Sequence, residues 1–282
     1  MSGQDSSLLQ QGRPPVILAV APNGARKTKA DHPALPITAD EIAATAAACR
    51  EAGAAMIHLH VRDPDGRHSL DVETYRAATA AVRAAVGRDL VVQITSEAVG
   101  IYRPEEQMQM VRELKPEAVS LAVREIVPDE AAEPAAADFL AWVRAEGILP
   151  QYILYSDDDL RRFDDLIARG VVPGERQVVL FVLGRYTKGQ ISEPRELMPF
   201  LAANSRDHLW SVCAFGPRET ACAVAAAALG GHARVGFENN FHLPDGSLAA
   251  DNAALVAAVA EGLGAIGGRP ASAEEARDLM GA

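Results

Sequence analysis

Short apolar segments alternate with alanine-rich segments along most of the chain. The apolar segments predict eight strands, at residues 16–22, 54–61, 90–96, 118–123, 148–154, 177–183, 209–215 and 233–237. The segments between them predict helices near residues 38–52, 72–86, 104–114, 134–146, 157–169, 193–203, 217–229 and 250–263. Such alternation implies parallel strands joined by right-handed crossovers. Eight repeats in 282 residues predict a closed (β/α)8 TIM barrel.

An open, doubly wound sheet is the alternative architecture. Its nucleotide-binding fingerprint, GxGxxG, should follow the first strand, but the chain reads APNGAR at residues 21–26. No linker or change of composition indicates a second domain. We therefore expect residues 14–282 to form one catalytic barrel and residues 1–13, MSGQDSSLLQQGR, to form a flexible N-terminal arm.

Composition argues against several classes of partner. The formal net charge is −11, which disfavours a nucleic-acid surface or an anionic membrane as partner. No apolar run reaches the roughly 20 residues that a membrane-spanning helix needs, and the start of the chain lacks the features of a secretory signal. The three cysteines form no CxxC pair, so neither a disulfide framework nor a thiolate zinc site is expected. A cytoplasmic protein that binds small molecules is the expectation.

Polar side chains fall on the strand faces that should point into the barrel. Because side chains alternate across a strand, His58 and His60 share the inward face of the second strand. Arg234 points inward on the eighth, and Glu238 does so too if the strand geometry continues past residue 237. Other inward or rim positions are predicted for Asn23, Gln93, Thr95, Ser120 and Gln151. The eighth strand neighbours the first, and the second lies beside it. The two histidines and Glu238 can therefore meet at the carboxyl end of the barrel, where active sites of this fold lie.

Two imidazoles and one carboxylate are a usual ligand set for catalytic Zn²⁺, with a fourth position left open. We therefore expect His58, His60 and Glu238 to hold one zinc ion per chain. Asp63, just past the strand, is predicted to orient one imidazole as a hydrogen-bond acceptor. Alternatives remain: the His-x-His pair can occur without a metal, and Arg234 can be a structural partner of Glu238 rather than a substrate clamp.

Two glycine-containing loops suggest an anion site. GRYTKG, at residues 184–189, places Arg185 and Lys188 after the sixth strand, and FGPRET, at residues 215–220, leads from Gly216 into a helix. A helix N-terminus beside the last two strands is a frequent phosphate site in barrels. Gly216 is therefore a candidate for substrate binding, with an ordinary glycine turn as the alternative.

Longer motifs resemble the β-keto acid cleavage enzymes, typified by 3-keto-5-aminohexanoate cleavage enzyme. The resemblance extends from about residue 15 to about residue 257. It rests on APNGA (21–25), P-x-T-x-x-E-I-A (36–43), AGAAMIHLHVRDPDG (52–66), QITS (93–96) and GGHARVGFENN (230–240).

The resemblance implies a zinc-dependent homotetrameric barrel that condenses a β-keto acid with acetyl-CoA and cleaves the adduct into acetoacetate and a new acyl-CoA. This is a reverse Claisen cleavage of a carbon–carbon bond. The three residues of the expected metal site match the family's ligands, and Arg234 matches the arginine on its last strand. Thr95 and Ser96 fall in the segment that holds the substrate's oxygens. Asn23, Ser120, Gln151 and Gly216 complete the predicted substrate-binding set.

Two residues depart from the family pattern. The family usually has Glu-Asp on the last strand, with the Asp as general base, whereas this chain has Glu238-Asn239. An acidic residue usually follows the proline of the fifth strand, where Gln151 stands here. An amide cannot accept a proton at neutral pH. Either another group is the base, or the reaction differs, or activity is lost. A metal-dependent hydrolase of the amidohydrolase type and an impaired barrel that binds a carboxylate metabolite or CoA therefore stay open as alternatives.

Overall fold

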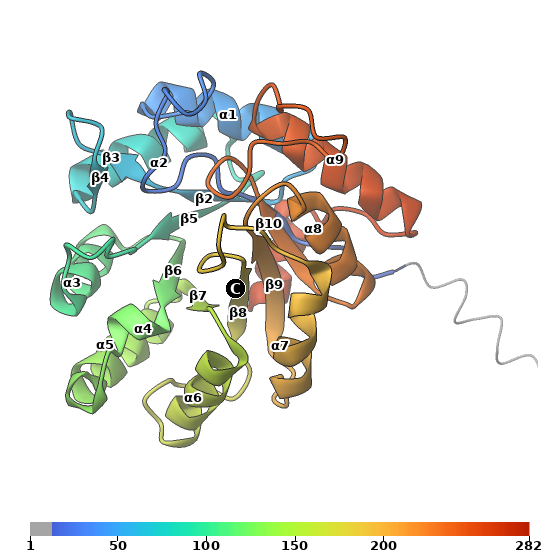
Figure 1. The fold of residues 1–282 in the computed structure, drawn as a ribbon. Coiled ribbons are helices and arrows are strands. Elements are labelled where there is room, and N and C mark those ends of the chain that lie inside the picture. The colour runs from blue at the N-terminus through green and yellow to red at the C-terminus, as the bar shows by residue number, and fades with distance from the viewer. Residues whose placement is uncertain (1–12, 282) are drawn as a thin grey trace, which may run out of the picture.

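The computed structural model describes residues 13–281, so the predicted N-terminal arm lies outside the described residues except for Arg13. Eight parallel strands close into a barrel in the order β1-β10-β9-β8-β7-β6-β5-β2, with helices around it (Figure 1). They are β1 (Leu18–Val20), β2 (Met56–Leu59), β5 (Val91–Thr95), β6 (Ala118–Ala122), β7 (Leu149–Leu154), β8 (Val178–Leu183), β9 (Leu209–Ala214) and β10 (His232–Val235). The predicted (β/α)8 fold is confirmed.

All eight predicted outer helices are present. They are α1 (Ala39–Glu51), α2 (Val72–Val86), α3 (Pro104–Leu114), α5 (Glu133–Ala145), α6 (Asp157–Ala168), α7 (Leu197–Ala203), α8 (Glu219–Ala228) and α9 (Asn252–Ala265). The start of α1 is a capping box, in which the Thr38 hydroxyl accepts from the Glu41 N–H and the Glu41 carboxylate accepts from the Thr38 N–H. No helix within residues 13–281 has the length and apolar character needed to cross a membrane.

The sequence analysis missed several short elements. They are a hairpin of β3 (Val61–Arg62) and β4 (His68–Ser69), the short helix α4 (Val123–Ile126), the 3-10 turns η1 (Glu130–Ala132) and η2 (Pro194–Glu196), and α10 (Ala273–Met280). The helix α10 begins at a capping box formed by Ser272 and Glu275, a pattern that can be read in the sequence. Its residues Ala276 and Met280 pack in one apolar cluster with Met56 of β2, closing the amino-terminal end of the barrel.

The barrel interior changes character along its axis. Ile17, Met56 and Val91 form part of the apolar cluster at the amino-terminal end. One layer further along, the interior is polar: His58 bonds to Gln93, Gln93 to Gln151, and Gln151 to Ser211. Because buried polar groups need partners, this chain of amides fixes the side chains that support the cavity above it.

Candidate active site

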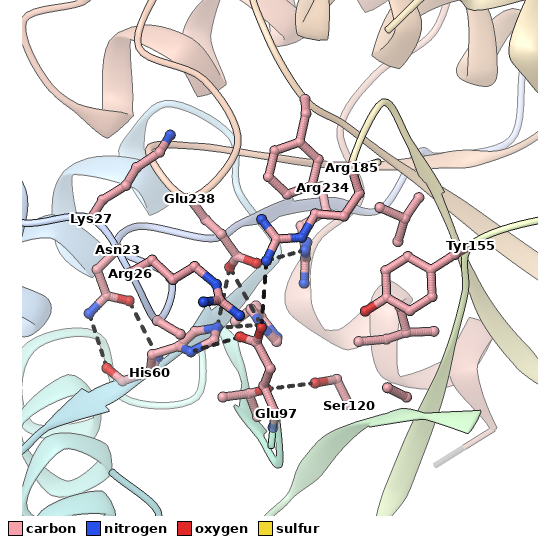
Figure 2. A pocket seen from close by; sticks show the side chains of 18 of the residues that line it. Asn23, Arg26, Lys27, His60, Glu97, Ser120, Tyr155, Arg185, Arg234 and Glu238 are labelled. Atoms are coloured by element: carbon pink, nitrogen blue, oxygen red, sulfur yellow. Dashed lines mark hydrogen bonds and ion pairs between the residues drawn. The ribbon is translucent and has the colours of Figure 1, made fainter. Parts of the chain in front are cut away.

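A cavity of about 180 Å³ lies at the carboxyl ends of the strands (Figure 2). Its polar wall includes His58, His60, Thr95, Ser120, Arg234 and Glu238. Its apolar wall includes Ala122, Ile153, Val182 and Phe215. The cavity therefore has the position that the fold predicts for an active site, with ionisable groups on one side and a hydrocarbon surface on the other.

His58, His60 and Glu238 bring three ligand atoms together. The two histidine Nε2 atoms are 3.2 Å apart, and Glu238 Oε2 lies 3.3 Å from Nε2 of His60 and 3.7 Å from Nε2 of His58. A tetrahedral ion with bonds of about 2.0–2.2 Å spaces its ligand atoms about 3.3 Å apart. Glu238 Oε2 is buried and has no hydrogen-bond partner among the described residues. The three residues thus fit a divalent metal ion and form a possible metal-binding triad.

The protonation states of this cluster suit metal binding. Burial and the nearby charge of Arg234 hold the pKa of His58 well below its usual value. Burial alone would raise the pKa of Glu238, but the charge of Arg234 beside it holds that pKa well below its usual value. A neutral imidazole and an ionised carboxylate are the forms in which these side chains bind a metal.

Gln93 orients His58. The His58 Nδ1 atom lies 2.7 Å from Gln93 Oε1, and both residues are fully buried. An amide oxygen only accepts, so Nδ1 carries the proton and Nε2 keeps its lone pair. Gln93 is itself held by a bond from its Nε2 to Gln151 Oε1, 3.2 Å long. Gln151 lies outside the cavity lining, which places it behind the site as a support.

The prediction that Asp63 orients an imidazole is wrong. Its carboxylate accepts hydrogen bonds from the N–H groups of Asp65 and Arg67, which close the turn between β3 and β4. The carboxylate beside His60 is Glu97, whose Oε2 lies 3.8 Å from His60 Nδ1. Glu97 directly follows the QITS motif, so its position after strand β5 could be predicted from the sequence. Its contact with His60 could not.

Asn23 and Gly24 fix the loop after β1 against the metal cluster. Asn23 lines the cavity, and its Nδ2 donates to the backbone oxygens of His60 and Pro36 at 3.0 and 3.1 Å. Gly24 has φ +62°, and a Cβ there would lie 2.6 Å from Glu238 Cγ. Only glycine permits both this backbone conformation and this close approach.

Arg234 combines the two roles left open by the sequence. Its Nη2 donates to Glu238 Oε1 at 3.1 Å and to Cys213 Sγ at 3.2 Å, so the structural ion pair exists. Its Nε and Nη1 are buried without any partner in the described part of the chain. Unpaired buried donors are unfavourable, and a bound anion would satisfy them.

The predicted contact residues divide into two groups. Thr95 and Ser120 line the cavity. Ser96, Asn239 and Gly216 do not: Ser96 Oγ donates to the Ser120 backbone oxygen, and a Cβ on Gly216 would lie 2.5 Å from the oxygen of Gln190. The loop around Gln190 therefore covers Gly216. The helix start near Gly216, predicted as an anion site, presents no surface to the cavity.

Asn239 faces a buried carboxyl group that the sequence analysis missed. Its Nδ2 donates to Glu219 Oε1 at 3.3 Å, and its Oδ1 accepts from Cys213 Sγ at 3.2 Å. Glu219 is 1 % exposed, and burial raises its pKa to about 8. An aspartate at position 239 would place two carboxyl groups in hydrogen-bond contact, which is unfavourable when both are ionised. The amide of Asn239 is thus complementary to Glu219.

Other ionisable residues of the lining come from loops that follow strands. Arg26 follows β1, Glu97 follows β5, Tyr155 follows β7 and Arg185 follows β8. The rule that barrel active sites are built from these loops would have found Arg26, Glu97 and Tyr155, none of which the sequence analysis selected.

Comparisons with known proteins show which family this chain resembles. The profile of the beta-keto acid cleavage enzyme family matches residues 15–281. The chain is 32 % identical over 276 residues to a 3-keto-5-aminohexanoate cleavage enzyme of Acetoanaerobium sticklandii, covering 94 % of this chain and 98 % of that protein. It is 29 % identical to a 3-oxoadipate:acetyl-CoA acetyltransferase of Cupriavidus necator, with 95 % of both chains covered.

Among solved structures, the apo structure of ObcA superposes with a TM-score of 0.71 at 18 % identity. The match covers 88 % of this chain and 66 % of ObcA, and it supports the fold alone. The family profile and both relatives each match almost the whole chain. The chain therefore belongs to the beta-keto acid cleavage enzyme family.

Proposed function

We propose that this protein exchanges acyl groups between a β-keto acid and acetyl-CoA, with a zinc ion held by His58, His60 and Glu238. In this reaction R–CO–CH₂–COO⁻ and CH₃–CO–SCoA give R–CO–SCoA and CH₃–CO–CH₂–COO⁻. The main supporting observation is that three metal-ligand atoms converge in one cavity beside Nε and Nη1 of Arg234, which have no hydrogen-bond partner among the described residues. The names of the relatives, a keto acid cleavage enzyme and an acetyl-CoA acetyltransferase, support the same chemistry.

Zinc, when bound, would supply a Lewis acid that polarises the keto oxygen and makes the neighbouring carbon acidic. The chain's own residues bind and orient the reactants. The Nε and Nη1 donors of Arg234 are available to a substrate oxygen, and the guanidinium keeps its charge throughout. The hydroxyl groups of Thr95 and Ser120 line the same wall and are 3.4 Å apart, where they can hydrogen-bond the keto acid's oxygens.

The reaction balances in three steps. The carbon between the two carbonyls loses a proton and attacks the thioester carbonyl, which releases the CoA thiolate. The thiolate then attacks the original keto carbon, and the bond between that carbon and the central carbon breaks. The central carbon regains a proton. Asn239 cannot be the proton acceptor; Glu97 is the lining carboxylate outside the proposed ligand set.

Product analysis tests this function. Zinc-loaded protein incubated with acetyl-CoA and a panel of β-keto acids should form acetoacetate and the new acyl-CoA in equal amounts with at least one acid. The variant His60→Ala should lose this activity. Absence of both products across the panel, or loss of acetyl-CoA by simple hydrolysis, would refute the proposal.

The alternatives have less support. An amidohydrolase-type site needs further histidines on the fifth and sixth barrel strands, whereas Gln151, Leu180 and Val182 occupy the interior positions there. Asn239 is the reason to consider an impaired barrel. Because Asn239 contacts Glu219, a test of this alternative must change both residues. The double variant Asn239→Asp, Glu219→Gln exchanges the two groups without pairing two carboxyls. A steep gain in turnover would favour an impaired relative, and a loss would favour a working enzyme. Cytoplasmic location and a homo-oligomeric state stay predictions.

A further inference from the structure

The cavity carries more positive charge than the proposed reaction needs. Its ionisable lining contains the cations Arg26, Lys27, Arg185 and Arg234 against the carboxylates Glu97 and Glu238. The whole chain, in contrast, has a formal net charge of −11. Arg234 lies beside the metal cluster and serves the carboxylate and keto oxygen that every β-keto acid has. The remaining cations have no assigned partner in the reaction.

Two of these cations are poorly suited to bind a substrate group deep in the cavity. Lys27 Nζ already donates to the Phe237 backbone oxygen at 2.8 Å and lies 4.1 Å from the centre of the Phe241 ring. Arg26 is exposed, so water solvates its charge. Arg185 is therefore the remaining cation that could bind a substrate group deep in the cavity.

Arg185 is held in place without using its donors. Its guanidinium packs over the Phe215 ring, 5.1 Å from the ring centre, and its side chain is 22 % exposed. The guanidinium forms an ion pair with Glu97 at 3.9 Å, a distance too long for a hydrogen bond. No hydrogen bond from this guanidinium to another described residue is present. A largely buried guanidinium with free, preorganised donors is suited to bind an anion.

The position of Arg185 defines where that anion must be. Glu97 lies between Arg185 and His60, 3.9 Å from one and 3.8 Å from the other, so the guanidinium is a short acyl chain away from the metal cluster. Phe215 and Val182 line the same cavity and offer a hydrocarbon surface for that chain. Figure 2 shows Arg185 and Arg234 around the same cavity as His60 and Glu238.

Resting on the proposed function, we propose that the β-keto acid carries a second carboxylate at the far end of a short acyl chain, and that Arg185 binds it. Arg185 is then the specificity-determining residue, since a guanidinium pairs with a carboxylate through two parallel hydrogen bonds and repels an ammonium group. The phosphates of CoA are a less suitable partner, because the pantetheine arm holds them many bonds away from the thioester. The exposed Arg26 is better placed for those phosphates.

Paired substrates test the proposal on the zinc-loaded full chain. One substrate is the six-carbon 3-oxo dicarboxylic acid, and the other is 3-oxohexanoic acid, which has a methyl group in place of the distal carboxylate. We expect kcat/KM to favour the dicarboxylic acid. Arg185→Gln should lower its kcat/KM about 10- to 100-fold, the usual effect of a lost charged hydrogen bond, and leave the monocarboxylic acid unchanged. Arg185→Lys should restore part of the loss.

Lys188→Gln is the matched control, because it removes the same charge from the same loop at an exposed position outside the lining. This variant should keep the wild-type preference. Equal or better turnover of the monocarboxylic acid by the wild type would overturn the inference and leave the proposed function intact. A raised KM for acetyl-CoA in Arg185→Gln, equal with both acids, would also overturn it by assigning Arg185 to CoA.

Turnover of neither acid would contradict the proposed function for these substrates, and binding would then decide the inference. In calorimetric titration, tighter binding of the dicarboxylic acid that is lost in Arg185→Gln would support it. Equal binding of the two acids would overturn it.

Discussion

Gln93 should control the affinity of the metal site without touching the metal. Its Oε1 is the acceptor for His58 Nδ1, 2.7 Å away, and this bond leaves His58 Nε2 free to bind. Gln93→Leu keeps most of the side-chain volume but removes the acceptor. Outer-shell partners of this kind are typically worth about 10- to 100-fold in metal affinity, and the unsatisfied N–H should lower the free energy of unfolding by about 1–3 kcal/mol.

Competition with a zinc chelator measures this effect. Gln151→Leu is the matched control, because it removes the partner of Gln93 at 3.2 Å but leaves the bond to His58 in place. We expect a weaker loss of zinc affinity in Gln151→Leu than in Gln93→Leu. A Gln93→Leu protein that folds normally and binds zinc as tightly as the wild type would refute this account of the His58 tautomer.

Three further predictions concern other parts of the barrel. Arg234→Lys should keep bound zinc but lower kcat/KM by about 100-fold or more, because the ammonium cannot reproduce the planar donors; elemental analysis and steady-state kinetics check both. Gly24→Ala should weaken zinc binding because the new Cβ would displace Glu238. Gly87 is the control: it has a similar φ of +59°, but a Cβ there would meet no other atom, so Gly87→Ala should only lower the denaturant midpoint. Burial lowers the pKa of His232 to about 4. Keeping this histidine neutral therefore stabilises the fold above the unfolded pKa of about 6.5, and this stabilisation is lost as the pH falls towards 4. Between pH 7 and pH 5 the free energy of unfolding, measured with urea, should fall by about 2 kcal/mol. His232→Asn offers a similar acceptor but does not titrate, so this pH dependence should disappear in the variant.

Most of the site residues that could be predicted follow from the alternation of side chains along the strands. It places His58 inward, and His60, one residue past the end of β2 at Leu59, continues the same alternation. Glu238 is a different case, since β10 ends at Val235 and the loop beyond it determines where the carboxylate lies. Gly24 and Gly236 permit the close packing of that loop against the end of β1.

Partners across strands could not be read from the sequence. Gln93 meets His58 because β2 and β5 pair with these two residues in register, and the sequence does not give that register. The failed assignment of Asp63 has a similar cause, because the chain after β2 folds into a hairpin and turns this carboxylate into a loop cap. Glu219 begins a helix and packs under the end of β10, a tertiary contact without a local signal.

Zinc stoichiometry tests the central claim most directly. Metal-stripped protein should be dialysed against zinc and then analysed for bound metal, in the wild type, in His60→Ala, and in His232→Asn as a control at a distant buried histidine. The account predicts about one zinc per chain in the wild type and in His232→Asn, and almost none in His60→Ala. Wild-type protein that binds no zinc, or a His60→Ala protein that binds as much as the wild type, would contradict it.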